Sequence, residues 1–466
     1  MIRLHPSIGV LLVAAAALGG CAVKQPPPAD DALAGILPSG SVVPDAWKAG
    51  NGLPGTTPAE WVRTFGDPQL EMLIDEALRN NLDLQAAAAR VEVASALVSQ
   101  ARSLLFPQLS VIAGVGVVGR DAVKDRSGLA GEISWELDLW GRVRAQTASA
   151  VANRQAFEAD QHYARQSVAA MVATLWYQTI AIERSRRTAE EAAVVYDDLL
   201  RLVGTRHRIG KVSQQEVALA GADLYRARHQ ERVYATSEQQ VARGLEVTLG
   251  RYPADELALA ADLPALPPPV PAGIPAELLE RRPDLIAAER RVAAAFHTIQ
   301  ATKATRLPRI ALTGLGGRST SELLRLADVG AGFWTVAANF LAPIFTGGAI
   351  EARIDQATAE QQAALATFGQ TALRAFSEVE TALASEGLLA DQQAYLERVL
   401  REDSDAVRLS RVRYDIGSSD LLDVLQLQAR QLDTRFQLIG VRADRLANRV
   451  ALHLALGGGF DPPPAP

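Results

Sequence analysis

The sequence predicts a mainly α-helical protein with a transmembrane β-barrel part, built as a tandem duplication of one structural unit. Three observations support this fold class. The same order of segments occurs twice, at an offset of about 200 residues. Each copy contains a helical stretch of about 65 residues with few Gly and no Pro inside. Each copy also contains two short segments in which apolar and polar residues alternate, as they do in strands.

The bulk composition is that of a folded protein with a large core. The chain has 466 residues, of which 48% are hydrophobic and 21% are charged. The net charge is -6, and no basic block is interleaved with aromatic residues. This balance argues against nucleic acid as a partner.

The N-terminus, residues 1–20, has the form of a secretory signal peptide. Its apolar run, residues 8–18, is too short to span a membrane and ends in Leu18-Gly19-Gly20-Cys21. Cys21 is the only cysteine, so a disulfide within the chain is impossible. The cysteine after small residues resembles the lipobox of bacterial lipoproteins, which implies a covalent lipid on Cys21 and, because Ala22 follows, sorting to the outer membrane. The alternative is a chance cysteine at the end of an ordinary signal peptide.

Residues 21–60 show no sustained periodicity and are rich in Pro, Gly and Ser, which predicts an extended, acylated tether. The repeat follows. Asn81-Leu82-Asp83-Leu84 recurs as Arg282-Pro283-Asp284-Leu285, an offset of 201 (284 − 83), and the Ile-Gly pair ending at Gly210 recurs at Gly417, an offset of 207 (417 − 210). We therefore expect a first repeat over 61–250, a Pro-rich joint and equatorial segment over 251–280, a second repeat over 281–457 and a tail over 458–466.

Each repeat is expected to contain the same elements in the same order. A helix ends before a proline, because proline cannot continue the helical hydrogen bonds. Two strands come next, then a very long helix, and then a helix that folds back as the second arm of a hairpin. The expected ranges in the two repeats are, for the first helix, 83–104 and 284–305; for the strands, 108–119 and 131–139, then 309–317 and 332–342; for the long helix, 142–208 and 349–413; for the returning helix, 213–249 and 420–456.

The strands raise the question of what their apolar faces contact. In the second strand Ile133, Trp135, Leu137 and Leu139 alternate with Glu132, Ser134, Glu136 and Asp138, and in the fourth Trp334, Val336, Ala338 and Phe340 share one face. Four strands cannot close a barrel, and open edges invite aggregation. Strands of this length can cross a bilayer when a closed barrel gives them lipid on one side and water on the other.

Closure must then come from other copies, and three chains of four strands each would supply twelve strands. In that barrel Trp135 faces lipid, Trp140 and Trp334 lie near the two membrane interfaces, and Glu132, Glu136 and Asp138 face the lumen. The alternative is a soluble sandwich fragment that rests on helices.

The sequence shows no catalytic or metal-binding pattern. The six histidines lack His-Glu-x-x-His spacing, no Gly-rich phosphate loop follows a strand, and one Cys with three Met forms no soft-metal site. We therefore expect a protein that is not an enzyme and has no cofactor besides the lipid on Cys21.

The chain resembles the TolC/OprM-type outer-membrane efflux channels, in particular the NodT-like lipoprotein branch that serves tripartite RND pumps. The resemblance spans Trp61 to Gly457 and is carried by five sets of motifs: Phe65-Gly66-Asp67-Pro68-Gln69-Leu70; Ser134 to Arg142 (SWELDLWGR); Arg281-Arg282-Pro283-Asp284-Leu285 with Ala288-Glu289; Pro343-Ile344-Phe345-Thr346-Gly347-Gly348; and the two Ile-Gly turns. It implies a homotrimer with a 12-stranded outer-membrane β-barrel, a long periplasmic α-helical tunnel and an equatorial domain.

The resemblance also implies roles for the two hairpin turns. They form the periplasmic tip that meets the adaptor protein, with these contact residues: Ile209, Gly210, Lys211, Val212, Ser213, Ile416, Gly417, Ser418, Ser419 and Asp420. Asp423 matches a gate aspartate, Glu216 is its repeat equivalent (423 − 216 = 207), and Tyr414 matches a tyrosine of the closing network. Two positions depart from that pattern: Gln426 replaces a second aspartate and Ser419 replaces an arginine. A ring of three Asp423 side chains favours cations. The alternative is that Asp423 is simply an acidic residue near a helix N-terminus.

These features predict a passive exit duct in the outer membrane, lipid-anchored, with a tunnel that extends into the periplasm. It would accept drugs or other toxic compounds from an inner-membrane RND transporter through a periplasmic adaptor. Two alternatives stay open: an outer-membrane duct for type I protein secretion, and, from another class, a periplasmic coiled-coil adaptor or scaffold.

Overall fold

The computed structural model describes residues 24–36, 43–49, 61–118, 124–320 and 331–458; Cys21 lies outside these ranges. The chain divides into two compact units. The first contains residues 1–42, 87–160 and 284–371, and the second contains residues 43–86, 161–283 and 372–466. Among the helices of the described ranges, none has both the length and the apolar character that a membrane crossing requires.

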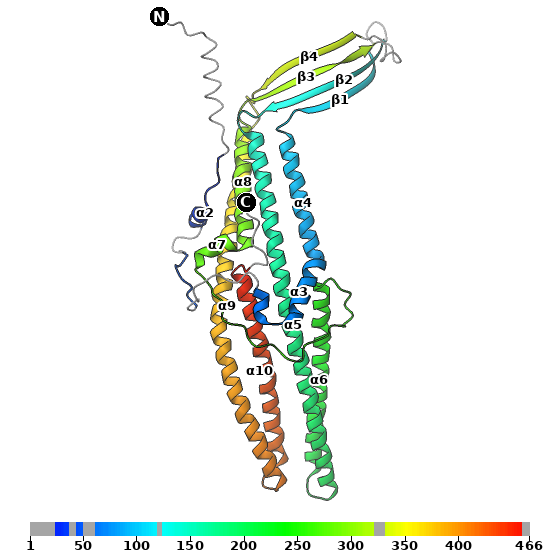
Figure 1. Ribbon diagram of the computed structural model, residues 1–466, viewed down its shortest axis with the longest axis vertical. Helices are drawn as coiled ribbons and strands as arrows, with labels where there is room; N and C mark the ends of the chain where they lie inside the picture. The colour runs from blue at the N-terminus through cyan, green and yellow to red at the C-terminus, as the bar shows by residue number, and fades with distance from the viewer. Residues whose placement is uncertain (1–23, 37–42, 50–60, 119–123, 321–330, 459–466) are drawn as a thin grey trace. The chain divides into compact units, whose positions relative to one another are not determined.

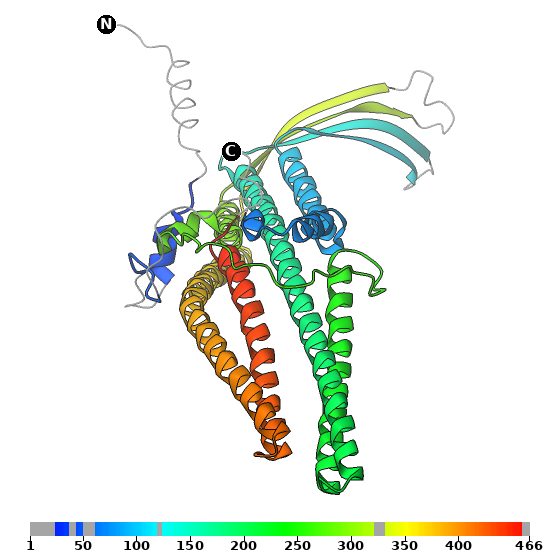
Figure 2. The ribbon, with the colours of Figure 1, turned by 60° about the horizontal axis from the view of Figure 1, so that its bottom comes forward.

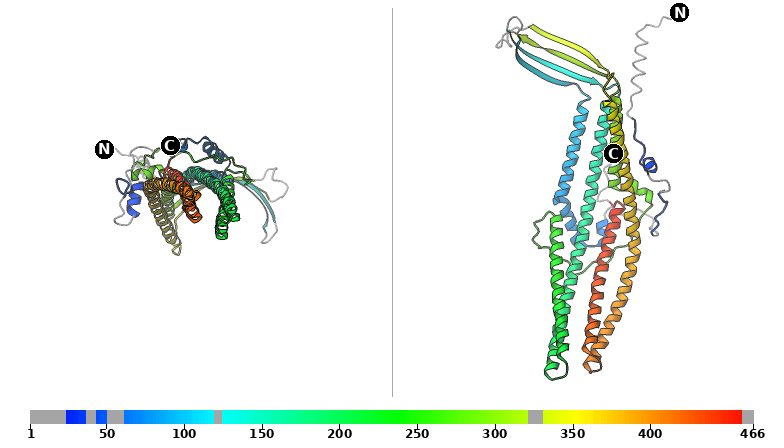
Figure 3. Two further views of the ribbon diagram at one scale, coloured as in Figure 1. Left: turned by 90° about the horizontal axis from the view of Figure 1, so that it is seen from below. Right: turned by 180° about the vertical axis from the view of Figure 1, so that it is seen from behind.

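The first unit contains a four-stranded antiparallel sheet in the order β1-β2-β3-β4 (Figure 3, right). Helices α4 (Leu82–Ser103) and α8 (Pro283–Ala304) precede its two hairpins, as expected. The strands are β1 (Gln108–Val118), β2 (Lys124–Leu137), β3 (Arg309–Thr320) and β4 (Ala331–Leu341) (Figure 1). The strand over 131–139 was placed wrongly, because β2 begins seven residues earlier (131 − 124) and ends at Leu137.

The strand register places most of the large apolar residues of the four strands on one face of the sheet, whereas Ile112, Leu315, Phe333 and Leu341 lie on the other face. Leu109 lies opposite Ile133, Ile133 lies opposite Gly314, and Gly314 lies opposite Val336. Directly opposed residues share a face. This confirms the alternation expected for β2 up to its end and for β4. The apolar face includes Leu109, Val111, Leu129, Ile133, Trp135, Leu137, Ile310, Leu312, Trp334, Val336, Ala338 and Phe340.

The turn after β2 explains why the strand ends at Leu137. The two carboxylate oxygens of Asp138 accept hydrogen bonds from the backbone N–H groups of Val143 and Arg144, both at 2.9 Å, in the first turn of the helix that follows. Gly141 turns the chain with a φ of 71°. Leu139 and Asp138 therefore belong to a helix-capping turn and not to the strand.

The second unit contains most of two helical hairpins, whose long helices begin in the first unit and enter the second at residues 161 and 372 (Figure 2). The first joins α5 (Arg142–Arg208) to α6 (Gln214–Thr248), and the second joins α9 (Ala349–Asp415) to α10 (Leu421–Ala455). The bounds expected from the sequence are confirmed to within two residues. Between α6 and α8 lie a short 3₁₀ turn (η2, Pro275–Glu277) and α7 (Leu278–Arg281).

Glycines at equivalent positions end the helices of both hairpins. Gly210 and Gly417 have φ of 75° and 76°, and Gly250 and Gly457 have φ of 78° and 70°. After each of these glycines the next N–H donates back to a carbonyl five residues earlier, as Lys211 does to Arg206 at 2.9 Å. This is the Schellman arrangement, which needs a residue in the left-handed region. The duplication is thus preserved in backbone geometry.

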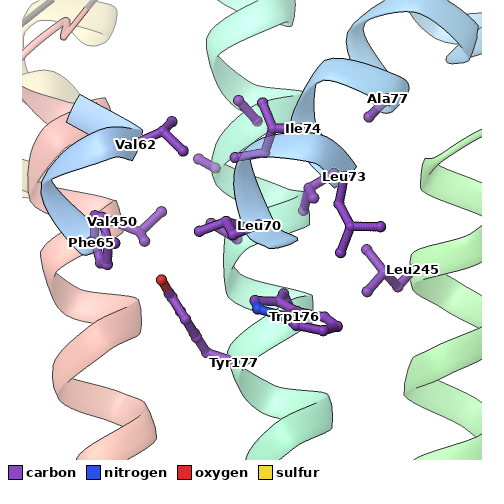
Figure 4. Packing of buried hydrophobic residues seen from close by; sticks show 14 of the residues in the cluster. Val62, Phe65, Leu70, Leu73, Ile74, Ala77, Trp176, Tyr177, Leu245 and Val450 are labelled. Carbon is purple, nitrogen blue, oxygen red and sulfur yellow. The ribbon is translucent and has the colours of Figure 1, made fainter. Parts of the chain in front are cut away.

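A hydrophobic cluster forms the core of the second unit (Figure 4). It is organised by a 3₁₀ turn (η1, Trp61–Phe65) and by α3 (Pro68–Asn80), which pack against α5, α6 and α10. The Asp67 carboxylate caps α3 by accepting from the N–H groups of Gln69 and Leu70, and it also accepts from Trp176 Nε1 at 2.8 Å. The carboxylate therefore ties the start of α3 to α5.

The structure describes two parts of the segment expected to be an extended tether, residues 21–60. Residues Ala29–Ile36 form helix α2, in which Leu33 is buried. Trp47 is also buried, and its Nε1 donates to the carbonyl of Ala272 at 3.1 Å. The N–H groups of Lys48 and Ala49 donate to the Glu380 carboxylate at 2.8 and 2.6 Å. The expectation of an extended tether is wrong for 29–36, which form a helix, and residues 47–49 are bound by groups far along the chain.

The glycines that end the helices differ in how closely other atoms pack around them, so alanine substitutions at these positions should differ in their cost to stability. A Cβ at Gly250 would lie 2.7 Å from the carbonyl oxygen of Asn80, whereas one at Gly210 has nothing within 4 Å. Gly250→Ala is therefore expected to cost about 3 kcal/mol of unfolding free energy, from backbone strain plus a steric clash. Gly210→Ala should cost about 1–2 kcal/mol, from backbone strain alone. Urea titration of both variants measures this difference, and equal losses would contradict it.

Candidate functional site

The two hairpin turns, residues 209–213 and 416–420, contain all ten residues expected at the tip. Ile209 and Ile416 are 63% and 74% exposed in the single chain. Directly behind the turns, side chains from both hairpins form one cluster, so the structure brings the two turns together. The cluster contains Tyr196, Val203, Ala220, Leu224, Ala227, Tyr414, Leu421, Val424 and Leu425.

The first turn is stabilised by a capping box. Ser213 Oγ accepts from the N–H of Glu216 at 3.3 Å, and the Glu216 carboxylate accepts from the N–H of Ser213 at 2.7 Å. In the second turn Asp420 is the N-cap residue but makes no side-chain capping bond. There the hydroxyl of Ser419 donates to the carboxylate of Asp423 at 2.8 Å. Glu216 and Asp423 occupy equivalent positions in the two repeats, but their hydrogen bonds differ. Glu216 caps its own helix, and Asp423 does not.

Asp423 and Gln426, both expected near the gate, line a groove of about 610 Å³ between α9 and α10. Arg413 and Arg430 line the same groove, so the Asp423 carboxylate shares it with two guanidinium groups. The full lining is Ala406, Leu409, Ser410, Arg413, Ser419, Asp423, Gln426, Leu427 and Arg430. The groove is polar, with charged groups of both signs.

Tyr414 connects the two hairpins through its ring. The side chain is buried, and the Arg206 guanidinium lies 4.4 Å above the ring centre. Arg206 also pairs with Asp415 at 3.6 Å. The Tyr414 hydroxyl is buried and makes no hydrogen bond within the described ranges. Tyr414 therefore contributes packing and a cation–π contact here, and its role in a closing network stays a prediction. The Arg206 contacts were not anticipated from the sequence.

The acidic residues expected in the lumen fall in different surroundings. Glu132 and Glu136 lie on the sheet face opposite to the apolar one. The Glu136 carboxylate forms a bidentate pair with Arg142, at 3.0 and 2.9 Å. Asp138 was wrongly placed on the strand; it caps α5 and also pairs with Arg144 at 3.2 Å. Two of the three carboxylates are therefore neutralised within the chain.

The three tryptophans expected at the membrane differ in their contacts. Trp135 Nε1 donates to the carbonyl of Leu105 at 3.0 Å, and Trp140 Nε1 donates to that of Pro308 at 2.6 Å. Trp334 is 82% exposed on the apolar face of the sheet. Each ring presents apolar surface, and Trp135 and Trp140 also satisfy their N–H groups, as Trp does at an interface between polar and apolar surroundings. Within the part of the chain that the structure describes, no group of three His, Cys, Asp or Glu side chains is placed to hold a metal ion.

Comparison with known proteins gives consistent results. The chain matches the family model described as "Outer membrane efflux protein" over residues 73–251 and 274–458, which correspond to the two repeats. It is 31% identical over 468 residues to the pyoverdine export outer membrane protein OpmQ of Pseudomonas aeruginosa, covering 96% of each chain. It is also 31% identical over 414 residues to the toluene efflux pump outer membrane protein TtgC of Pseudomonas putida, covering 86% of this chain and 85% of that one.

Solved structures support the same assignment. The outer-membrane channel OprN matches with a TM-score of 0.85 and 26% identity, over 95% of this chain and 100% of that one. The open state of the Neisseria gonorrhoeae MtrE outer membrane channel matches with a TM-score of 0.83 and 27% identity, over 94% and 99%. The resemblance to outer-membrane efflux channels found in the sequence motifs is confirmed. The chain belongs to the outer membrane efflux protein family.

Proposed function

We propose that this protein is the outer-membrane exit duct of a tripartite efflux pump. Three copies close a 12-stranded barrel, anchored by a lipid on Cys21, and their helical hairpins form a tunnel in the periplasm. The duct is passive. An inner-membrane RND transporter delivers small toxic molecules to it through a periplasmic adaptor.

One observation carries this proposal for a chain of this family: one face of the open sheet is mainly apolar. Several of its side chains are largely exposed in the single chain, among them Leu109 at 78%, Trp334 at 82% and Val336 at 74%. Exposed apolar patches of this kind mark an interaction surface. Strands β1 and β4 form the two edges of the sheet. Pairing β4 of one copy with β1 of the next satisfies both edges and turns the apolar face toward lipid.

The tip supports the remaining part of the proposal. Ile209 and Ile416 are exposed at the turns and offer apolar contacts to an adaptor. In a trimer Asp423 would occur three times around the axis; a ring of these carboxylates favours cations where it, and not the Arg413 and Arg430 of the same groove, faces the passage. The curated relatives carry names that refer to pyoverdine, toluene and antibiotic efflux. From these names we infer for this protein only the general class of substrate, which is small molecules that the cell expels.

The test is fractionation of the expressed full-length protein, with an unheated gel and mass analysis of the outer-membrane extract. We expect a trimer that dissociates on heating and a mature chain that begins at an acylated Cys21. Cys21→Ser should remove the lipid mass, and the assembled trimer should persist because barrel closure does not involve residue 21. A mature protein that is monomeric and remains in solution without detergent would overturn the proposal.

A further inference from the structure

The turn between β4 and α9 exposes two large apolar side chains to an unusual degree. Ile344 is 98% exposed and Phe345 is 91% exposed, and the two are adjacent. Isolated exposed apolar residues are common on protein surfaces, but an adjacent pair with almost no contact of its own indicates a missing partner.

Two glycines and two backbone hydrogen bonds define the junction between this turn and α9. Gly347 and Gly348 have φ of 58° and 84°, and a Cβ on either would meet nothing within 4 Å, so the backbone and not the available space requires glycine. The N–H of Ala349 donates to the carbonyl of Thr346 at 3.1 Å, and that of Ala352 donates to Gly348 at 3.0 Å. These contacts fix the start of α9, and Ile344 and Phe345 lie directly before it with their side chains exposed.

An equivalent turn within the chain already has its partner. Leu137, the last residue of β2, lies opposite Ile310, the second residue of β3. In the turn after β2, Trp140 reaches the turn that precedes β3 and donates its Nε1–H to the carbonyl of Pro308 at 2.6 Å. Trp140 is 48% exposed, about half the exposure of Phe345. The aromatic residue after a descending strand thus contacts the turn before the next ascending strand.

The next ascending strand after β4 belongs to another copy. Strand β4 is an edge of the sheet, and the other edge is β1, which is preceded by Phe106-Pro107, the repeat equivalent of Leu307-Pro308 (308 − 107 = 201). When antiparallel strands pair, the C-terminal end of one lies beside the N-terminal end of the other. Phe106 is 65% exposed and offers a matching apolar surface.

We propose that Ile344 and Phe345 of each copy pack on the Phe106-Pro107 turn of the next copy and form an apolar contact between subunits beside the β4–β1 seam. This inference rests on the proposed function, because it requires closure of the sheet by further copies. It assigns a role to the Pro343-Ile344-Phe345-Thr346-Gly347-Gly348 motif. The occupant is a second copy of this chain; membrane lipid is the competing occupant that the test distinguishes.

A cysteine pair tests the contact. Phe106→Cys and Phe345→Cys combined in one chain should form disulfides between chains, seen as two- and three-chain species on a non-reducing gel that reducing agent removes. Each single variant controls for disulfides that involve Cys21. Phe345→Cys combined with Tyr252→Cys is a mismatched pair, because Tyr252 is 86% exposed but is not part of the proposed contact. Both controls should lack the ladder.

Amine-reactive cross-linking of the same samples separates the two proposals. The contact would be overturned if the amine reagent yields trimers while the matched cysteine pair gives no disulfide ladder, or gives a disulfide within one chain. Either result would indicate that lipid or another molecule covers Ile344 and Phe345, and would leave the exit-duct proposal intact. Monomers with both reagents would overturn both proposals. The second measurement is the temperature to which a sample must be heated before its trimer band disappears from the gel. The double variant Ile344→Ser with Phe345→Ser should lower this temperature, whereas Tyr252→Ser should not. An unchanged temperature would also contradict the contact.

Discussion

Replacing Arg449 with alanine is expected to lower the free energy of unfolding by about 3–5 kcal/mol, because it leaves two backbone carbonyls without their donor and leaves Glu386 with only its more distant partners, Arg445 and Asn448. Arg449 lies on α10 and is 1% exposed. Its Nη2 donates to Glu386 at 2.6 Å, and its Nη1 donates to the carbonyls of Pro267, at 2.7 Å, and Pro268. One guanidinium thus fastens the Pro-rich joint and α9 to α10. Urea titration of the purified protein, followed by its helical circular dichroism, measures the change.

A second arginine on the same helix is the control. Arg442 pairs with Glu397 at 3.1 Å, but these two side chains are 48% and 36% exposed. Water screens such a pair, so Arg442→Ala should cost about 0.5 kcal/mol. Arg449→Lys should recover only part of the loss, because an ammonium group cannot reproduce the planar fork of donors. Equal costs for Arg442→Ala and Arg449→Ala would show that the buried arginine does not hold the joint.

The helical framework could be predicted because its boundaries depend on local backbone chemistry. Pro107 and Pro308 end the helices before the strands, since proline lacks the N–H that continues a helix. Gly210 and Gly417 end the long hairpin arms because only glycine adopts the required positive φ without strain. These signals act within a few residues and need no knowledge of the tertiary fold.

The N-terminal contacts could not be predicted, because they depend on residues far apart in sequence. Trp47 is fixed by the carbonyl of Ala272, which lies 225 positions away. No local pattern in residues 21–60 indicates that partner. Helix α3 is a different case: Asp67 followed by Pro68 is an N-cap with proline at the first helical position, a signal that could have revealed it.

In the candidate site, the sequence identified the turns but not how their side chains are bonded. Alternation of apolar and polar residues continues through Asp138, so periodicity alone could not show that this carboxylate leaves the strand to cap a helix. The duplication likewise equated Glu216 with Asp423. Their bonds differ because Ser213 completes a capping box with Glu216, and Asp420, which stands in its place, makes no such bond.

Acidification is expected to destabilise the core of the second unit through His453. This side chain is 2% exposed, stacks on the Trp61 ring with centroids 5.3 Å apart and lies 6.2 Å from the Phe65 ring. Burial, together with the charge of Arg449 on the same helix, lowers the pKa of His453 from 6.5 to about 4. Between these values the unfolded chain binds a proton that the folded protein excludes. Stability is therefore complete above pH 6.5, falls as the pH drops toward about 4, and levels off below that.

Between about pH 7.5 and about pH 4.5, the shifted pKa of His453 lowers the free energy of unfolding by about 2.5 kcal/mol. Carboxylates also begin to titrate at the acid end of this range. The informative quantity is therefore the free energy of unfolding lost between the two pH values, measured by urea titration and compared between the parent and His453→Asn. The variant should lose about 2.5 kcal/mol less than the parent over this range. His229→Asn replaces an exposed histidine of α6 and should follow the parent. If the parent and His453→Asn lose stability in parallel, protons do not act through His453, and the acid sensitivity of this core must reside in its carboxylates.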